Sequence, residues 1–187
     1  MNRILFVLGP SGVGKSEISK AFQETYSFLH VDIDQDRDSQ HGFELNHLPA
    51  EWDKDIALID FTQLATEIQR RIAQQSRVGA VVSVPTTHVF SSQQLKIAGN
   101  AGLSPVVLWG TEQQCIQARR ERSKKNRKRF NEKDVERYQR KNRRTFETYS
   151  HPEYDPYRIV VFSPDGGPHR PLEYNLMSIM HRTGWFL

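Results

Sequence analysis

Short apolar runs alternate along the chain with segments in which apolar residues recur every three or four positions. The runs predict buried strands at residues 4–8, 28–32, 80–84, 105–109 and 158–162. The intervening segments predict helices that begin near residues 15, 60, 91, 111, 131 and 172. Strands that alternate with helices in this way are typical of a parallel sheet covered by helices, so the pattern predicts an α/β fold.

Polar residues and a glycine mark several helix ends. Asp60, Ser91 or Ser92, and Asn131 each stand where a helix is predicted to begin, and their side chains can accept main-chain hydrogen bonds there. Gly184 follows the last apolar stripe and predicts its end.

The first apolar run leads directly into a glycine-rich stretch that fits the pattern G-x-x-x-x-G-K-[ST]. A helical pattern follows, so the order is strand, loop and helix, as a phosphate-binding loop requires. The stretch consists of Gly9, Pro10, Ser11, Gly12, Val13, Gly14, Lys15 and Ser16.

Each part of this P-loop has a chemical task. Gly9, Gly12 and Gly14 allow the backbone to curl until its N–H groups point at phosphate oxygens, and the following helix adds its positive end. Lys15 is predicted to reach the β- and γ-phosphates, and the Ser16 hydroxyl to bind Mg²⁺. The sequence therefore predicts ATP and Mg²⁺ as cofactors.

The second strand runs into acidic residues. Asp34 is a candidate to orient or deprotonate an acceptor hydroxyl, and Asp32 is a candidate metal ligand. Arg37 can bind an anionic group of the acceptor. The alternatives are that the carboxylates only solubilise a loop and that Arg37 forms a surface ion pair. Residues 37–59 are predicted to form the acceptor pocket.

The third strand lacks the aspartate of a Walker-B motif, so a second protein ligand for Mg²⁺ has to come from elsewhere, with Asp32 or Asp34 as candidates. Thr86 follows this strand and is a candidate acceptor-binding residue. Carboxyl ends of parallel strands share one edge of the sheet. The P-loop, the Asp34 segment, residues 83–88 and residues 163–168 are therefore expected to converge.

Basic residues are concentrated in one segment. Residues 119–144 contain 14 of the 26 Lys and Arg but 4 of the 22 acidic residues, within a net charge of +4. We expect residues 119–131 to form a lid, with Arg119 on the nucleotide and with Arg122 and Arg127 stabilising the transferring group. A nucleic-acid surface over 119–144 and a merely solvated helical face are the alternatives.

The length of 187 residues predicts a single domain over 1–187. Cys115 is the single cysteine, which fits a reducing compartment, and we expect it to be a small buried residue. The chain has no apolar run long enough to span a membrane and no signal-peptide core, so we expect a cytoplasmic protein.

These features together resemble the small P-loop kinases, which include shikimate kinase, gluconate kinase and the kinase domain of polynucleotide kinases. The resemblance implies a three-layer P-loop NTPase fold with a five-stranded parallel sheet in the order 2-3-1-4-5 and an arginine-rich lid. It also implies that adenine lies between the lid helix and the loop after the fifth strand, where Pro164 stands.

The individual members match differently. The spacing of Asp34 and Arg37 resembles the Asp-x-x-Arg of polynucleotide 5′-hydroxyl kinases. Shikimate kinases carry a glycine triplet after the third strand, where this chain has Pro85-Thr86-Thr87, which argues against shikimate as the acceptor.

The sequence thus favours an ATP-dependent kinase that phosphorylates a hydroxyl of a small molecule. A polynucleotide 5′-hydroxyl kinase is one alternative, with the basic segment on the nucleic acid. An ATP-binding switch that transfers nothing is the other.

Overall fold

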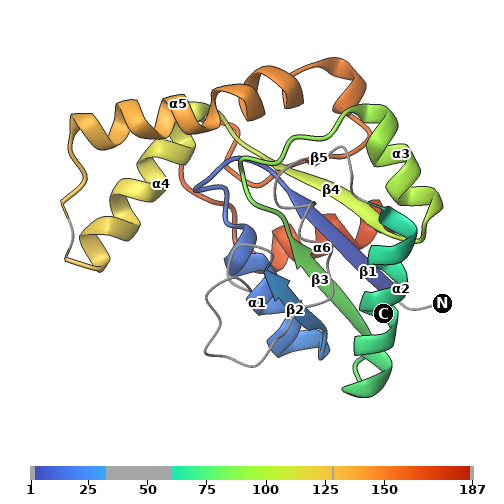
Figure 1. The fold of residues 1–187 in the computed structure, drawn as a ribbon. Coiled ribbons are helices and arrows are strands. Elements are labelled where there is room, and N and C mark those ends of the chain that lie inside the picture. The colour runs from blue at the N-terminus through green and yellow to red at the C-terminus, as the bar shows by residue number, and fades with distance from the viewer. Residues whose placement is uncertain (1–2, 33–59, 128, 186–187) are drawn as a thin grey trace.

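The computed structural model describes residues 3–32, 60–127 and 129–185 (Figure 1). The predicted acceptor segment 37–59, with Asp34 and Arg37, lies outside these residues. The strands are β1 (Arg3–Leu8), β2 (Leu29–Asp32), β3 (Gly79–Ser83), β4 (Ser104–Trp109) and β5 (Arg158–Val160). The helices are α1 (Lys15–Tyr26), α2 (Phe61–Gln74), α3 (Ser92–Asn100), α4 (Glu112–Lys125), α5 (Glu132–Tyr149) and α6 (Leu172–Thr183), with a 3₁₀ turn, η4 (Pro152–Tyr154).

The five strands form one parallel sheet in the order β2-β3-β1-β4-β5, which confirms the predicted order. β1 is central, and Val7 is in register with Ser83 of β3 on one side and Val106 of β4 on the other. The P-loop therefore leaves the sheet from its middle strand, with the ends of β3 and β4 beside it.

Helices cover both faces of the sheet (Figure 1). The core on the α2 and α3 face includes the ring of Phe6, which packs edge-on against Phe61 and Phe90 at centroid distances of 6.0 and 5.5 Å. The core on the α1 and α6 face includes Phe22 and Phe28, 5.4 Å apart. Because the central strand is buried on both faces, its residues from Ile4 to Leu8 are all apolar rather than alternating with polar ones.

The predicted helix ends are confirmed. Asp60 accepts two main-chain hydrogen bonds at the start of α2. Ser91, Thr111 and Asn131 each form a capping box at the start of α3, α4 and α5. Gly184 ends α6 with a φ of 69°, which a residue with a side chain rarely adopts.

The last strand is shorter than predicted. β5 ends at Val160 rather than at residue 162. The carbonyl of Val161 instead accepts a 2.8 Å hydrogen bond from the main-chain N–H of Arg170, and Phe162 pairs with His169 in an antiparallel bridge. The chain therefore folds back on itself after β5 and forms a tight loop over 163–168.

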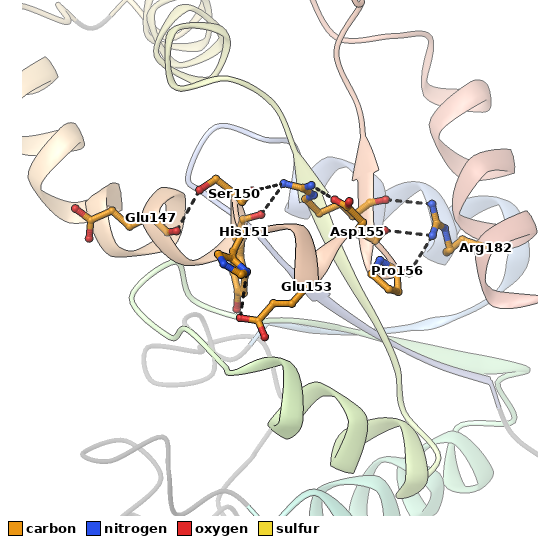
Figure 2. A network of polar contacts seen from close by, with 9 residues as sticks. Glu147, Ser150, His151, Glu153, Asp155, Pro156 and Arg182 are labelled. Carbon is orange, nitrogen blue, oxygen red and sulfur yellow. Dashed lines mark hydrogen bonds and ion pairs between the residues drawn. The ribbon is translucent and has the colours of Figure 1, made fainter.

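Helices α4 and α5 extend as a hairpin from the end of the sheet where β1 leads into α1 (Figure 1). A network of polar contacts joins the end of α5, the turn that follows it and Arg182 (Figure 2). Arg158 pairs with the Asp155 carboxylate and donates to two main-chain carbonyls at the end of α5, at 3.0 and 2.9 Å. Arg182 of α6 donates to three carbonyls within residues 155–158, at 3.0 to 3.4 Å. The end of α5 is thus tied to β5, and the turn leading into β5 is tied to α6.

Among the helices in residues 3–32, 60–127 and 129–185, none has the length and apolar character needed to cross a membrane.

Candidate active site

The P-loop curls through three glycines with positive φ. The φ angles of Gly9, Gly12 and Gly14 are 133°, 87° and 91°, in the range that favours glycine. A Cβ at residue 9 would collide with the Leu108 carbonyl, and one at residue 12 would lie 2.6 Å from the Cys115 carbonyl oxygen. The glycines therefore allow both the turn itself and its close approach to β4 and α4.

Lys15 folds back over this loop. Its ammonium donates hydrogen bonds to the carbonyls of Gly9 and Pro10, at 2.7 and 3.1 Å, and lies 3.3 Å from the Thr86 hydroxyl. Ser16 is exposed in the first turn of α1. The structure thus brings together the positive end of α1, the Lys15 charge and Thr86, which suits an anion at this point.

A serine stands near the place where a Walker-B motif would put an aspartate. The Ser83 hydroxyl lies 2.7 Å from the Ser19 hydroxyl and 3.4 Å from Nε2 of His30. The Ser19 hydroxyl also donates a hydrogen bond to the Lys15 carbonyl at 2.9 Å. Ser19 and Ser83 are buried. The end of β3 therefore holds the first turn of α1 in place, and Asp32 lies beside Ser83 in the ladder of β2.

Ser11 is held by both helices of the hairpin. Its N–H donates to Oδ1 of Asn142 at 2.7 Å, and its carbonyl accepts from the Tyr138 hydroxyl at 2.7 Å. Its own hydroxyl accepts from Arg119 of α4 at 2.5 Å. The Arg119 guanidinium also lies over the Tyr138 ring, 5.8 Å from its centre. The structure therefore places Arg119, a predicted nucleotide-binding residue, on the P-loop itself.

The other two predicted lid arginines lie farther along the hairpin. Arg122 is exposed on α4, and Arg127 is exposed beyond its end with a φ of 53°. Within the described residues, no hydrogen bond joins either side chain to the P-loop. Their catalytic role stays a prediction that requires the hairpin to move.

The loop over 163–168 packs against the base of α4. The Gln114 side-chain amide donates to the carbonyls of Ser163 and Gly167, at 3.1 and 3.4 Å. Pro164 is exposed in this loop. Of the segments predicted to converge, residues 83–88 contact the P-loop through Thr86, and His169, which follows the 163–168 loop, lies beside Gly14.

His169 was not predicted from the sequence. Its ring stacks on Phe162, with centroids 4.0 Å apart, and its Nε2 would lie 3.4 Å from a Cβ at Gly14. Burial lowers the pKa of this imidazole, and the carboxylate of Glu17 opposes the shift. The His169 ring thus packs beside Gly14 of the P-loop.

Cys115 is buried behind the P-loop, as predicted. Burial raises the pKa of its thiol to about 12, so the thiolate that a nucleophile needs is not formed near neutral pH.

Four buried residues on one face of α5 were also missed; the first three contact the P-loop or the Thr86 carbonyl, and the fourth contacts Phe90. The spacing of four, three and four positions is that of one helix face, a signal that was present in the sequence but hidden among basic residues. They are Tyr138, Asn142, Thr145 and Tyr149.

The described residues contain no group of three or more His, Cys, Asp and Glu side chains placed to hold a metal ion. The Ser16 hydroxyl is an oxygen donor of the kind that Mg²⁺ accepts, and Mg²⁺ bound with a nucleotide commonly takes few protein ligands because phosphate oxygens and waters supply the rest. The curl of the P-loop, the close packing around its glycines and the Lys15 charge likewise fit the phosphates of a nucleoside triphosphate.

Comparison with solved structures shows likenesses over nearly the whole chain, among them the following two. A gluconokinase from Sinorhizobium meliloti 1021 is 20% identical, with a TM-score of 0.53 over 98% of this chain and 91% of its own. A sugar kinase from Janibacter sp. HTCC2649 is 16% identical, with a TM-score of 0.54 over 97% of this chain and 94% of its own. No protein-family model matches the sequence, and no curated protein matches it.

The strand order, the P-loop and these two likenesses show that the chain has the fold of the small P-loop kinases. The predicted resemblance is confirmed at the level of the fold.

Proposed function

We propose that this protein is an ATP-dependent kinase that transfers the γ-phosphoryl group to a hydroxyl of a small molecule. The observation that carries the proposal is the position of the Lys15 ammonium, between the P-loop carbonyls and the Thr86 hydroxyl. In this proposal, the phosphates held by the loop would meet an acceptor near this ammonium, beyond the end of β3.

The nucleotide side of the site would be formed by the P-loop. Its main-chain N–H groups would hold the phosphate oxygens, and Lys15 would bind the β- and γ-phosphates. Ser16 and Asp32 would hold Mg²⁺, which neutralises phosphate charge when bound. Arg119 and Pro164 would border the nucleotide, while Arg122 and Arg127 would neutralise the transferring group once the hairpin closes.

The acceptor side would be formed by Asp34, Arg37 and Thr86. In the transfer, the acceptor oxygen forms a bond to the γ-phosphorus while the bond from that phosphorus to the β–γ bridging oxygen breaks, which releases ADP. The proton of the acceptor hydroxyl passes to the Asp34 carboxylate. Thr86 would orient the acceptor beside Lys15.

The test measures ADP release from Mg-ATP against a panel of acceptors. Sugars and sugar acids come first, because the two solved structures are named as a gluconokinase and a sugar kinase. Shikimate, nucleosides and a 5′-hydroxyl oligonucleotide complete the panel. We expect release that depends on one acceptor.

Three variants accompany the panel. Lys15→Ala should abolish transfer, and Asp34→Ala should abolish transfer but keep ATP affinity. Lys20→Ala, an exposed lysine on the same helix that pairs with Glu24, should leave both unchanged. Normal transfer by Asp34→Ala would refute the assignment of Asp34 as the base. ATP binding without ADP release for any acceptor would favour the alternative of an ATP-binding switch that transfers no phosphoryl group.

A polynucleotide 5′-hydroxyl kinase is the second candidate. Exposed basic side chains on the α4–α5 hairpin favour this candidate. Within the described residues, no carboxylate forms an ion pair with these side chains. They include Arg120, Lys124, Lys125, Arg137 and Arg140. Binding through many phosphates weakens steeply with salt. ADP release that depends on the oligonucleotide would select this candidate if it also falls steeply between about 50 and 200 mM salt, the range over which binding through many phosphates weakens.

A further inference from the structure

The three polar groups of Ser11 are all engaged by the α4–α5 hairpin. We propose that Tyr138 and Asn142 are positioning residues that hold the P-loop in its nucleotide-binding conformation and thereby couple nucleotide affinity to the hairpin. The inference rests on the proposed function only in that it takes the P-loop as an ATP site.

The first step concerns the peptide units on either side of Ser11. Asn142 fixes the N–H of Ser11 and Tyr138 fixes its carbonyl, so both of its peptide units are held. The carbonyl of Ser11 shares a peptide unit with the N–H of Gly12, whose φ of 87° is one of the three positive φ angles of the curl. If that unit rotated, the Gly12 N–H would turn away from the phosphate position, because glycine offers little resistance to rotation.

The second step concerns the rigidity of the two side chains. Asn142 is 0% exposed and Tyr138 is 4% exposed. The Asn142 amide nitrogen donates to the Tyr138 carbonyl at 2.8 Å, which orients its oxygen toward Ser11. Both groups are therefore fixed before any ligand binds, as a positioning role requires.

The third step concerns the helix that carries them. Farther along α5, the Thr145 hydroxyl donates to the Thr86 carbonyl at 2.8 Å, and the Tyr149 hydroxyl accepts from the N–H of Phe90 at 3.1 Å. One helix face thus holds the P-loop and the segment after β3 at a fixed separation. The same helix is the second arm of the hairpin, so movement of its first half would change the hydrogen bonds that Tyr138 and Asn142 form with Ser11.

The test compares two phenylalanine variants of the full-length chain. Tyr138→Phe removes the hydroxyl that holds Ser11, and Tyr149→Phe removes a hydroxyl of the same helix that holds Phe90 instead. Each loses a hydrogen bond to the main chain, and Tyr138→Phe also loses the contact of its hydroxyl with the Cys115 thiol, so the thermal stability of each variant is measured beside its nucleotide affinity. The readout is the dissociation constant of a fluorescent ATP analogue, measured without any acceptor.

We expect Tyr138→Phe to weaken binding of the analogue by about three- to tenfold, the effect of one hydrogen bond. Tyr149→Phe should stay within about twofold of the unmodified chain. Asn142→Ala should weaken binding at least as much as Tyr138→Phe, because it leaves the Ser11 N–H without its acceptor. Asn142→Asp restores an acceptor and should recover part of the loss.

Equal weakening by Tyr138→Phe and Tyr149→Phe would overturn the proposal, since general destabilisation would then explain both. Unchanged binding in Tyr138→Phe and Asn142→Ala would also overturn it. If the unmodified chain binds the analogue but phosphorylates nothing, the kinase proposal fails while the comparison of variants still decides this one. If the unmodified chain binds no nucleotide, both proposals fail.

Discussion

The side-chain nitrogen of Lys15 lies 3.3 Å from the hydroxyl oxygen of Thr86, although 71 residues separate them in the chain. This contact joins the phosphate-binding loop to the segment that follows β3. In the proposed reaction, a phosphoryl group held by the loop and an acceptor hydroxyl would meet at this point.

Replacing Thr86 tests the acceptor side of this point. Thr86→Val keeps the shape of the side chain and removes the hydroxyl, so we expect kcat/KM for the acceptor to fall about tenfold while ATP affinity stays within about twofold. Steady-state kinetics with each substrate varied in turn will show the split. Thr87→Val, at an exposed neighbour, is the control. A loss of ATP affinity equal to that of Lys15→Ala would assign Thr86 to the nucleotide instead.

Two glycine substitutions should have opposite effects. At residue 12, φ is 87° and a Cβ would lie 2.6 Å from the Cys115 carbonyl oxygen, so Gly12→Ala should destabilise the fold by about 1–3 kcal/mol and abolish ATP binding. Gly99 lies in α3 with nothing within 4 Å of its Cβ position, so Gly99→Ala should stabilise by about 0.5–1 kcal/mol. Urea denaturation and nucleotide titration measure both. ATP binding by Gly12→Ala would contradict this expectation, because the P-loop would then accommodate a Cβ at residue 12 and still hold phosphate.

Glu67 should contribute stability that acid removes. It contacts Arg70 and Arg71, each at 2.7 Å, and the hydrogen bond from Arg70 is the largest cause that lowers its pKa, to about 2. Unfolded glutamate has a pKa of 4.5, so the stabilisation is complete above that pH and is lost as the pH falls toward 2. Glu67→Gln should cost about 1 kcal/mol at pH 7 and less at pH 3, by urea denaturation.

The control for Glu67 is Glu147→Gln. Glu147 forms a 3.8 Å pair with Arg143 in which the Arg143 and Glu147 side chains are 77% and 68% exposed, and such pairs contribute little. Equal costs for the two variants at pH 7 would contradict the importance of the buried Arg71 partner.

His169 should make the fold weaker in mild acid. Burial lowers the pKa of its imidazole below the ordinary 6.5, while Glu17 of α1 and Glu121 of α4 oppose this. The unfolded chain therefore takes up a proton as the pH falls through 6.5, before the folded chain does, and stability falls with it. Between pH 7.5 and 5.5, the unmodified chain should lose more unfolding free energy than His169→Gln.

Chemical denaturation at the two pH values tests this expectation. His151→Gln, at an exposed site, controls for the loss of an imidazole. The same pH dependence in the unmodified chain and in His169→Gln would exclude His169 as the source.

The sequence by itself determined the features that depend on neighbours in the chain. Apolar runs identify the strands because a central strand is buried on both faces, and the P-loop is readable because Gly9, Gly12 and Gly14 must adopt positive φ within one turn. The helix caps at Asp60, Ser91 and Asn131 are also readable from the sequence, because each side chain bonds main-chain groups only two or three residues away. The strand order came from resemblance to a fold, and the role of Asp34 stays a prediction.

Only the tertiary structure decided which side chains hold the loop. Tyr138 and Asn142 meet Ser11 across 127 and 131 residues of chain, and their contact depends on how the α4–α5 hairpin packs against the P-loop. His169 reaches Gly14 because the chain folds back after β5. A residue's preference for helix or strand is encoded locally, but the partner it meets is set by the packing of whole elements, which a pattern along the chain does not contain.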